Sequence, residues 1–309
     1  MSWEPHTVVT EEYLDPGPVA ALTALLGSGA PAVGPGDPLP PLWHWAALAR
    51  WPAAAEIGPD GHPRRGSFLP PVELPRRMFA GGEVSFEAPL LVGSTVRREA
   101  TVSAVTLKRG RSGELVVVVV QITLTGPDGV VAVRERQDLI YREAAAAAGT
   151  GPDTPAADPV GVPLLRHGPG DWELRTDPTV LMRFSAVTAN AHRIHYDRPY
   201  ATEVEGYRGL VVHGPLTTLA LAETLRVDHT CPPVLLRHRN LAPVFCGDQV
   251  RLRSTSPETP PGTEADAPCG ANVELVATGA SAAPTATDAT ITHSALTAEF
   301  PTPEPKSHA

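Results

Sequence analysis

The chain has 309 residues, 42% of them hydrophobic, which suits one large domain or two of ordinary size. Its formal net charge of −9 excludes the broad basic face of a general nucleic-acid-binding protein, so no nucleic-acid partner is expected. Neither a run of about eighteen apolar residues nor a secretory signal is present, so we expect no membrane span. Three cysteines without a CxxC pair predict neither a disulfide framework nor a zinc site, and they favour a cytoplasmic protein.

The first half of the chain predicts one helix followed by strands. The helix covers the Trp- and Ala-rich segment 42–50, which Pro52 ends. Alternating apolar residues predict three strands, at 97–107, 114–125 and 130–141. The Gly-Pro-Asp-Gly sequence at 126–129 joins the last two strands as a hairpin turn.

The second half follows a linker and has the same order of elements. Residues 143–163 are mainly Ala, Gly, Pro and Asp without an aromatic residue, which is typical of a linker. An apolar helix is predicted from Pro215 to about Arg226, with proline in its first turn. Strands are expected at 249–256, 271–278 and 289–300, with a polar loop at 256–270. The predicted organisation is a first domain at 1–145, a linker at 146–165, a second domain at 166–300 and a tail at 301–309.

A faint internal repeat links the two halves. Residues 86–97 and 240–251 share Ala, Pro, Gly, Val and Arg at one constant offset, each time in a turn before a strand. One helix inside a curved antiparallel sheet, present twice, predicts an α+β fold of tandem, or double, hot-dog type.

The residues that carry chemistry lie in a short stretch of the second half. Asn190, His192, His195 and Asp197 occupy a turn-like segment, and the sequence His213-Gly214-Pro215 later begins the apolar helix. A histidine can transfer protons at neutral pH, and the free N–H groups of a helix N terminus stabilise an oxyanion.

Segments 184–199 and 209–214 resemble the MaoC-like, or hydratase-2, branch of hot-dog acyl-thioester dehydratases. The match places His195 at the family's catalytic histidine, Asn190 where that family usually has a catalytic aspartate, and His192 where it usually has asparagine. Segments 58–71 and 74–82 resemble the fatty-acid-synthase-like dehydratase domain that precedes this module in mesaconyl-C4-CoA and itaconyl-CoA hydratases. The resemblance covers roughly residues 40–145 and 175–300.

The resemblance implies a hydro-lyase that adds or removes water across the 2,3 double bond of an acyl thioester. His195 would be the principal base and acid, Asn190 would hold the water or β-hydroxyl, and Gly214 would let the thioester oxygen approach the helix amides. Asp197 is expected to orient His195, and His192 is expected to be structural support. The first half would have lost catalysis and would form a wall of the acyl tunnel. No metal and no cofactor is implied apart from the coenzyme A or phosphopantetheine of the substrate.

Four arginines form a basic concentration in this acidic chain. Two readings stay open for them, a solvated loop or a contact with the phosphates of coenzyme A or of a carrier-protein arm. These residues are Arg64, Arg65, Arg76 and Arg77, with His213 as a further substrate-binding candidate.

Other functions and assemblies also remain open. A hot-dog thioesterase usually needs a carboxylate on the catalytic helix, where Glu223 lies too far along. A non-catalytic thioester-binding subunit would explain an amide at Asn190. Tandem hot dogs complete one pseudo-dimer within a chain, which is compatible with a monomer and with a homodimer.

Overall fold

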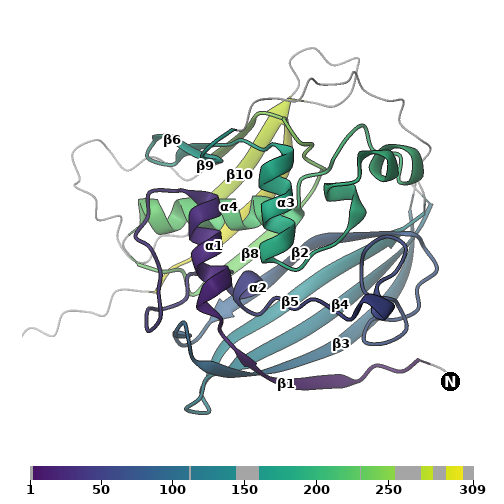
Figure 1. The fold of residues 1–309 in the computed structure, drawn as a ribbon, viewed down its shortest axis with the longest axis horizontal. Coiled ribbons are helices and arrows are strands. Elements are labelled where there is room, and N and C mark those ends of the chain that lie inside the picture. Colours follow the sequence, from purple (N-terminus) through teal and green to yellow (C-terminus); the bar gives the residue numbers. More distant parts are fainter. Residues whose placement is uncertain are drawn as a thin grey trace, which may run out of the picture.

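The computed structural model describes residues 3–110, 113–143, 160–229, 231–254, 273–280 and 290–301. Its strands form one antiparallel sheet of eleven strands, and the helices gather on one side of the first-half strands (Figure 1). The strand order is β1-β3-β4-β5-β2-β8-β11-β10-β9-β7-β6, so each half of the sequence supplies one contiguous half of the sheet.

The three predicted strands of the first half lie close to their expected positions as β3, β4 and β5, and β1 and β2 are two more that the sequence did not predict. Gly126 N–H donates to the Val130 carbonyl at 2.8 Å, which confirms the predicted hairpin turn between two of them. The strands are β1 (Thr7–Tyr13), β2 (Arg76–Phe86), β3 (Thr95–Gly110), β4 (Gly113–Thr125) and β5 (Val131–Arg142).

The second-half strands include the three that the sequence predicted and three more. β8 continues the sheet from β2, while β7 and β6 form its far edge. The strands are β6 (Leu164–Gly168), β7 (Asp171–Leu174), β8 (Leu235–Asn240), β9 (Val250–Ser254), β10 (Val273–Ala280) and β11 (Thr290–Glu299).

The sequence repeat is visible where the halves join. Glu83 of β2 pairs with Arg237 of β8, and their side chains form an ion pair at 2.7 Å across a sequence separation of 154 residues, the offset of the repeat. Gly93 and Gly247, which are equivalent in the repeat, both have φ of +86°. Because that conformation favours glycine, the two conserved turns of the repeat have the same backbone shape.

Two helices begin at an Asp-Pro step that the sequence analysis overlooked. Asp15 caps α1 (Pro16–Leu26) by accepting from Gly17 N–H, and Asp177 caps α3 (Pro178–Val187) by accepting from Val180 N–H. Both prolines occupy the first turn, where no backbone N–H is needed.

The predicted second helix is confirmed as α4 (Gly214–Asp228), whereas the predicted first helix is only the four-residue α2 (His44–Ala47). Short helical turns complete the set: the 3₁₀ turns η1 (Ala54–Glu56) and η2 (Arg193–His195), and the π-helix η3 (Tyr200–Val204).

The short α2 stands where the repeat places the start of α4. Leu39 N–H donates to Leu90 O at 2.7 Å, and Val212 N–H donates to Val244 O at 2.8 Å, the same contact in each half. The expectation of a long central helix in both halves is therefore wrong for the first. Pro52 follows closely after α2, and proline cannot continue a helix. The missing turns leave space against the first-half sheet.

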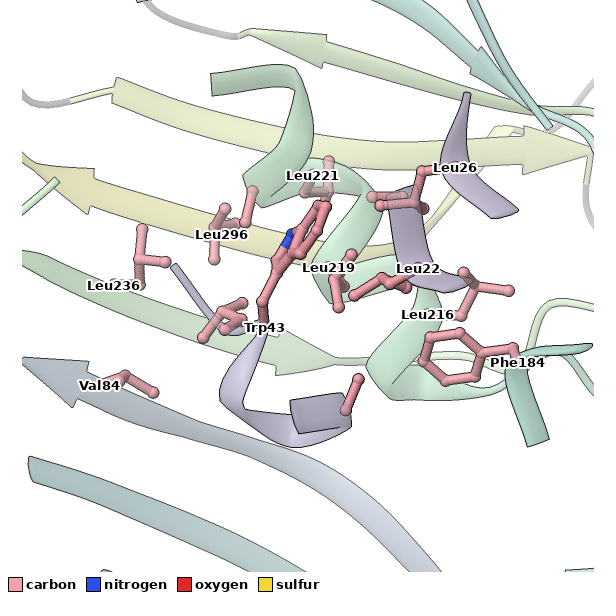
Figure 2. Packing of buried hydrophobic residues seen from close by; sticks show 14 of the residues in the cluster. Leu22, Leu26, Trp43, Val84, Phe184, Leu216, Leu219, Leu221, Leu236 and Leu296 are labelled. Carbon is pink, nitrogen blue, oxygen red and sulfur yellow. The ribbon is translucent and has the colours of Figure 1, made fainter. Parts of the chain in front are cut away.

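One hydrophobic core joins the two halves. Trp43, which directly precedes α2, packs among Leu219 and Leu221 of α4, beside Leu22 of α1 (Figure 2). Full burial of each such side chain stabilises the fold by roughly 1.5–3 kcal/mol. The apolar face of α4 is thus covered by elements from both ends of the chain.

Several sequence expectations concern residues outside the described ranges. These are most of the linker, the polar loop 256–270 and the tail from residue 302, so the division into domains at 1–145 and 166–300 stays a prediction. Cys231 takes part in a disulfide bond, which corrects the expectation of none, while Cys246 is free. Within the described ranges, every helix is too short or too polar to cross a bilayer.

Candidate active site

A cavity of about 880 Å³ lies between the first-half sheet and the motif segments of the second half. Its second-half wall includes Asn190, His192, His195 and Gly214, so the structure brings the principal predicted site residues together. Its first-half wall includes strand residues of β4 and β5, among them Ile122. The first half therefore lines the cavity, as the sequence analysis expected.

His195 ends the 3₁₀ turn η2 and is fixed by the backbone. Its Nδ1 lies 2.7 Å from the carbonyl oxygen of Val211. Because a carbonyl only accepts hydrogen bonds, Nδ1 carries the hydrogen and Nε2 keeps the lone pair on the cavity side. Burial first, and then the charge of His192, lower the pKa of His195 to about 3, against the opposing effect of the Val211 contact. The ring is therefore neutral at pH 7.

The N terminus of α4 opens into the same cavity at Gly214 and Pro215. No side chain caps this end among the described residues, so the first amide of the helix keeps a free N–H. A Cβ added at Gly214 would lie 2.8 Å from Asn240 Nδ2, which explains the need for glycine. An anionic oxygen placed here would meet a partial positive charge.

His213 lies behind His195 and does not line the cavity. The two imidazole rings stack with centroids 3.5 Å apart, and His213 Nε2 lies 2.8 Å from Ser185 Oγ. His213 is fully buried. The prediction that it binds substrate is therefore wrong, because the helix entry turns its ring toward α3 and the underside of His195.

Asn190 lines the cavity with one end of its amide already used. Its Oδ1 accepts from His192 N–H at 3.0 Å, as in an Asx turn. Nδ2 has no hydrogen-bond partner among the described residues, so it remains a donor for a cavity ligand. The structure supports hydrogen bonding by Asn190 and excludes proton acceptance by the same amide oxygen.

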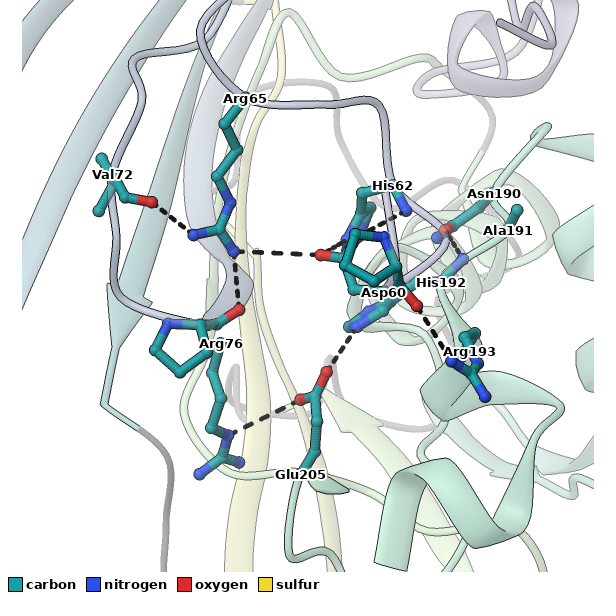
Figure 3. A network of polar contacts seen from close by, with 12 residues as sticks. Asp60, His62, Arg65, Val72, Arg76, Asn190, Ala191, His192, Arg193 and Glu205 are labelled. Atoms are coloured by element: carbon teal, nitrogen blue, oxygen red, sulfur yellow. Dashed lines mark hydrogen bonds and ion pairs between the residues drawn. The ribbon is translucent and has the colours of Figure 1, made fainter. Parts of the chain in front are cut away.

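His192 belongs to a polar network that includes the first half (Figure 3). Its Nε2 lies 2.9 Å from Glu205 Oε1, and Glu205 is buried. The ring of His62 packs on that of His192 with centroids 4.0 Å apart, and His62 Nδ1 lies 3.1 Å from Asp60 Oδ2. The segment around Asp60 resembles a family motif, but its sequence did not indicate these residues as part of the site.

The pKa shifts of His62 and Asp60 in this network have clear physical causes. Burial, followed by the charge of Arg77, lowers the pKa of His62 well below its usual value. Burial alone would raise the pKa of Asp60, but the side-chain and backbone hydrogen bonds from His62 lower it below its usual range. Asp60 is thus a carboxylate at neutral pH and His62 is a neutral imidazole.

Asp60, His62 and His192 also bring ligand atoms within 4.8 Å of one another, a spacing that suits a metal ion. The same side chains satisfy one another and Glu205 by hydrogen bonding. The residues present therefore fit an internal hydrogen-bond network without requiring a metal.

The prediction that Asp197 orients His195 is wrong. Asp197 Oδ2 accepts from both Arg193 Nε and Nη2, at 2.9 and 2.7 Å, and Asp197 Oδ1 accepts from Tyr200 N–H. Burial has little weight here, and the hydrogen bond from Arg193 is the main cause that lowers the pKa of Asp197. The Val211 carbonyl performs the orienting role, a contact that sequence spacing does not reveal.

The four arginines separate into two pairs. Arg65 donates to the carbonyls of Val72 and Leu74, and the Arg64 guanidinium donates to the Ala55 carbonyl. Neither lines the cavity, so both hold the loop and the substrate-binding prediction is wrong for them. Arg76 and Arg77 do line the cavity, and Arg76 lies 3.8 Å from Glu205.

A second polar group that the sequence did not indicate lies in the first-half wall. Buried Glu135 accepts hydrogen bonds from His44 at 3.0 Å, Trp45 at 2.8 Å and Gln137 at 2.7 Å. Burial alone raises the pKa of Glu135, but these contacts, with His44 first, lower it below its usual range. His44 and Trp45 lie in the segment that the sequence predicted only as a helix.

Comparison with known proteins identifies relatives over most of the chain. The profile of the hydroxyacyl-thioester dehydratase type 2 family matches residues 42–246. The mesaconyl-C(4)-CoA hydratase of Chloroflexus aurantiacus is 40% identical over 272 residues, which cover 84% of this chain and 93% of that protein.

Solved structures of similar fold agree with this relationship. HtdX of Mycobacterium tuberculosis has a TM-score of 0.59 at 18% identity, covering 96% of this chain and 100% of that chain. A second protein of that organism, described as having a double hot-dog fold, has a TM-score of 0.52 at 14% identity, covering 97% and 96%. At these identities the likeness concerns the fold alone, and it confirms the tandem hot-dog prediction. With the family profile and the 40% identical hydratase, the chain belongs to the MaoC-like hydratases, in the hydroxyacyl-thioester dehydratase type 2 family.

Proposed function

We propose that the chain is a hydro-lyase that reversibly adds water to the 2,3 double bond of an acyl-coenzyme A thioester. The observation that carries the proposal is that His195 and the amide end of α4 open into one cavity. A proton-transfer group and an oxyanion site are the two elements that this reaction needs.

The geometry supports the following course for hydration. The thioester oxygen lies at the free N–H of Gly214, and a water lies between Asn190 Nδ2 and His195 Nε2. His195 removes a proton as the water oxygen attacks Cβ, and negative charge moves to the thioester oxygen. Cα of the enolate then takes up a proton, so that one water is added in total. The partial positive charge of the α4 N terminus stabilises that oxygen. Dehydration follows the same path in reverse.

The activity is tested with His195→Ala. Loss of the base is expected to lower the rate of hydration of crotonyl-CoA or mesaconyl-C4-CoA by at least about a hundredfold. The decrease of enoyl-thioester absorbance measures the rate. The control is His167→Ala, because His167 pairs with Glu173 at the surface. An unchanged rate in folded His195→Ala protein contradicts the assignment.

We further propose that the acyl group carries a second carboxylate, as in the substrate named for the Chloroflexus relative. Arg77 supports this choice, because it lines the cavity and has no ion-pair partner among the described carboxylates. A partly buried cation of this kind favours an anionic ligand.

This substrate class predicts a selective effect of Arg77→Leu. We expect kcat/KM for mesaconyl-C4-CoA to fall at least about tenfold, the effect of about 1.4 kcal/mol, while crotonyl-CoA is affected much less. The exposed Arg97→Leu serves as the control. Equal losses for both substrates would assign Arg77 to the coenzyme A portion or to folding.

A thioesterase is less compatible with the site. Glu223 is buried and lies outside the cavity lining, where its carboxylate accepts from Ser28 and Arg226. It is therefore not available to activate water for attack on the thioester carbonyl. Release of free coenzyme A without water addition would favour the thioesterase. If neither free coenzyme A nor a hydrated product forms, a binding subunit is favoured.

The choice between coenzyme A and a carrier protein, and the pairing of two chains, stay predictions. Comparing coenzyme A and carrier-protein thioesters of one acyl group tests the first. The mass of the purified protein in solution tests the homodimer.

A further inference from the structure

We propose that His192, paired with Glu205, is a second catalytic acid–base group of the hydro-lyase, and that Asp60 and His62 of the first half position it. This inference rests on the proposed function and adds residues to the same site.

The reaction needs a proton donor that Asn190 does not provide. Water addition removes one proton from water and delivers one to Cα. Asn190 has only amide N–H groups for the cavity, because its oxygen accepts from His192 N–H, and an amide does not release a proton at neutral pH. The residue that meets this need has to be titratable and close to His195.

His192 meets both conditions. It lines the cavity, and its ring centroid lies 5.5 Å from that of His195 with the planes perpendicular. Its Nε2 is paired with Glu205, which leaves Nδ1 as the nitrogen without a partner among the described residues. One small group between the two rings can therefore meet both imidazoles.

The two histidines have different hydrogen-bond partners, a carboxylate for His192 and a backbone carbonyl for His195. Glu205 is a buried carboxylate that stabilises a positive charge on His192. After burial, the charge of His192 is the main cause that lowers the pKa of His195. A histidine paired with a carboxylate, beside a histidine that burial keeps neutral, is the arrangement that an acid and a base require. The other charged groups that face this pair are Arg76, which is 3.8 Å from Glu205, and Asp60 with Arg77 near His62.

The first half holds His192 in place through the loop around Gly61. The His62 ring packs on His192, and Asp60 contributes its carboxylate to His62 and its backbone carbonyl to Arg193 N–H at 3.0 Å. The loop approaches so closely that a Cβ on Gly61 would lie 1.8 Å from the Ala191 carbonyl oxygen. The half that lacks the histidine motif thus still positions the proposed acid.

The proton movements balance. His195 Nε2 takes a proton from water while the oxygen forms its bond to Cβ, and the π electrons move toward the thioester oxygen. The enolate then takes the Nδ1 proton of His192 at Cα, which leaves His192 neutral with its Nε2–H on Glu205. A water between the rings returns the proton from His195 to His192, so the net change is addition of one water.

The discriminating variant is Glu205→Gln, which preserves shape and removes the charge. We expect kcat for hydration to fall at least about a hundredfold at pH 8, with little change in KM. Without the carboxylate the proton leaves His192 more readily, so the alkaline limb of the kcat–pH profile moves to lower pH. A purely structural role would lower kcat equally at every pH.

The matched control is Glu173→Gln, since Glu173 forms a His–Glu pair with His167 on the β6–β7 hairpin, away from the cavity. It is expected to leave the profile unchanged. If wild-type protein hydrates no acyl thioester, the proposed function fails. If the wild type is active and Glu205→Gln keeps its rate and profile, only the present inference fails.

A measurement on wild-type protein covers the case in which the variant does not fold. Imidazole resonances of histidine-labelled protein are expected to show a doubly protonated His192 at pH 7. The His192 resonances are assigned by comparison with folded His192→Asn protein or, if that variant does not fold, by through-bond correlations. A neutral His192 in active enzyme overturns the proposal.

Discussion

Four imidazole rings lie in a row across the two halves, and the partner of each ring decides what it can do. Centroid distances of 4.0, 5.5 and 3.5 Å join neighbours in the order His62, His192, His195, His213. Their respective partners are Asp60, Glu205, the Val211 carbonyl and Ser185. Burial keeps the rings of His62 and His195 neutral, and the Val211 carbonyl fixes the tautomer of His195. Glu205 is placed to stabilise the charge proposed for His192. The same residue type therefore takes different roles within one site.

At the same scale, the free amide of Gly214 gives a direct test of the oxyanion site. Gly214→Pro deletes that N–H at a helix start, where proline suits the backbone. Gly214→Ala adds the same Cβ beside Asn240 but keeps the N–H, so it is the matched control. We expect the hydration rate to fall about a hundred- to a thousandfold, the effect of losing one oxyanion donor. Circular dichroism should confirm a retained fold. Activity near the wild-type level would place the oxyanion site elsewhere.

At the scale of elements, loops and helix starts position the chemistry more than the strands do. The turn η2 holds His195, α4 presents its N terminus, and the segment from Pro59 to Pro63 closes on them from the other half. Arg193 joins η2 to that segment by donating from its backbone to the Asp60 carbonyl and from its guanidinium to the Pro59 carbonyl. The catalytic turn is therefore supported by residues distant in sequence.

That support predicts a large effect of Gly61→Ala. Gly61 has φ of +88°, and its new Cβ would lie 1.8 Å from the Ala191 carbonyl oxygen, so the loop has to move away. We expect hydration to fall at least about tenfold, because a small displacement of catalytic groups is costly. Gly36→Ala is the control, since its φ is +87° with open space around the new Cβ. Equal effects of both variants would attribute the loss to backbone strain alone.

At the scale of the whole molecule, an internal repeat has become unequal. The sheet keeps its pseudo-two-fold arrangement around Glu83 and Arg237, with equivalent strands on either side. The second half keeps the long helix α4, and the first half reduces its counterpart to α2. The space left by that reduction borders the cavity, which has one wall from each half. The second half holds the long helix and the motif histidines, and the first half provides the space for the cavity.

The buried histidines also predict a pH dependence of stability. His195 and His238 have pKa values lowered mainly by burial, to about 3 and about 4, against about 6.5 when unfolded. Because the folded pKa is depressed, this stability is fully present above pH 6.5 and is lost as pH falls toward the folded values. Each histidine contributes a slope of about 1.4 kcal/mol per pH unit in that window.

Urea unfolding at pH 7, 6 and 5 measures this loss. His238→Phe is the informative variant, because His238 stacks on Phe79 with centroids 5.3 Å apart and neither ring nitrogen has a partner within the described structure. We expect a shallower decline in the free energy of unfolding for this variant. A decline as steep as that of the wild type would contradict the assignment.

The sequence was most informative where short-range patterns decide structure. Alternation predicted the strands around the Gly126 turn, and three-to-four spacing predicted α4. The Asn190 to Asp197 motif indicated the site. The two missed helices had local signals as well, since Asp15-Pro16 and Asp177-Pro178 are ordinary helix starts.

By itself, then, the sequence determined the six strand segments that it predicted, the helix that carries Gly214 and the family to which the motifs belong, because each depends on neighbours along the chain. Only the tertiary structure decided that Val211 rather than Asp197 fixes His195, and that His62 packs on His192. It also decided that the first central helix stops after one turn. These outcomes depend on packing between distant segments, where burial and charge choose the partner of each polar group, and no local spacing encodes that choice.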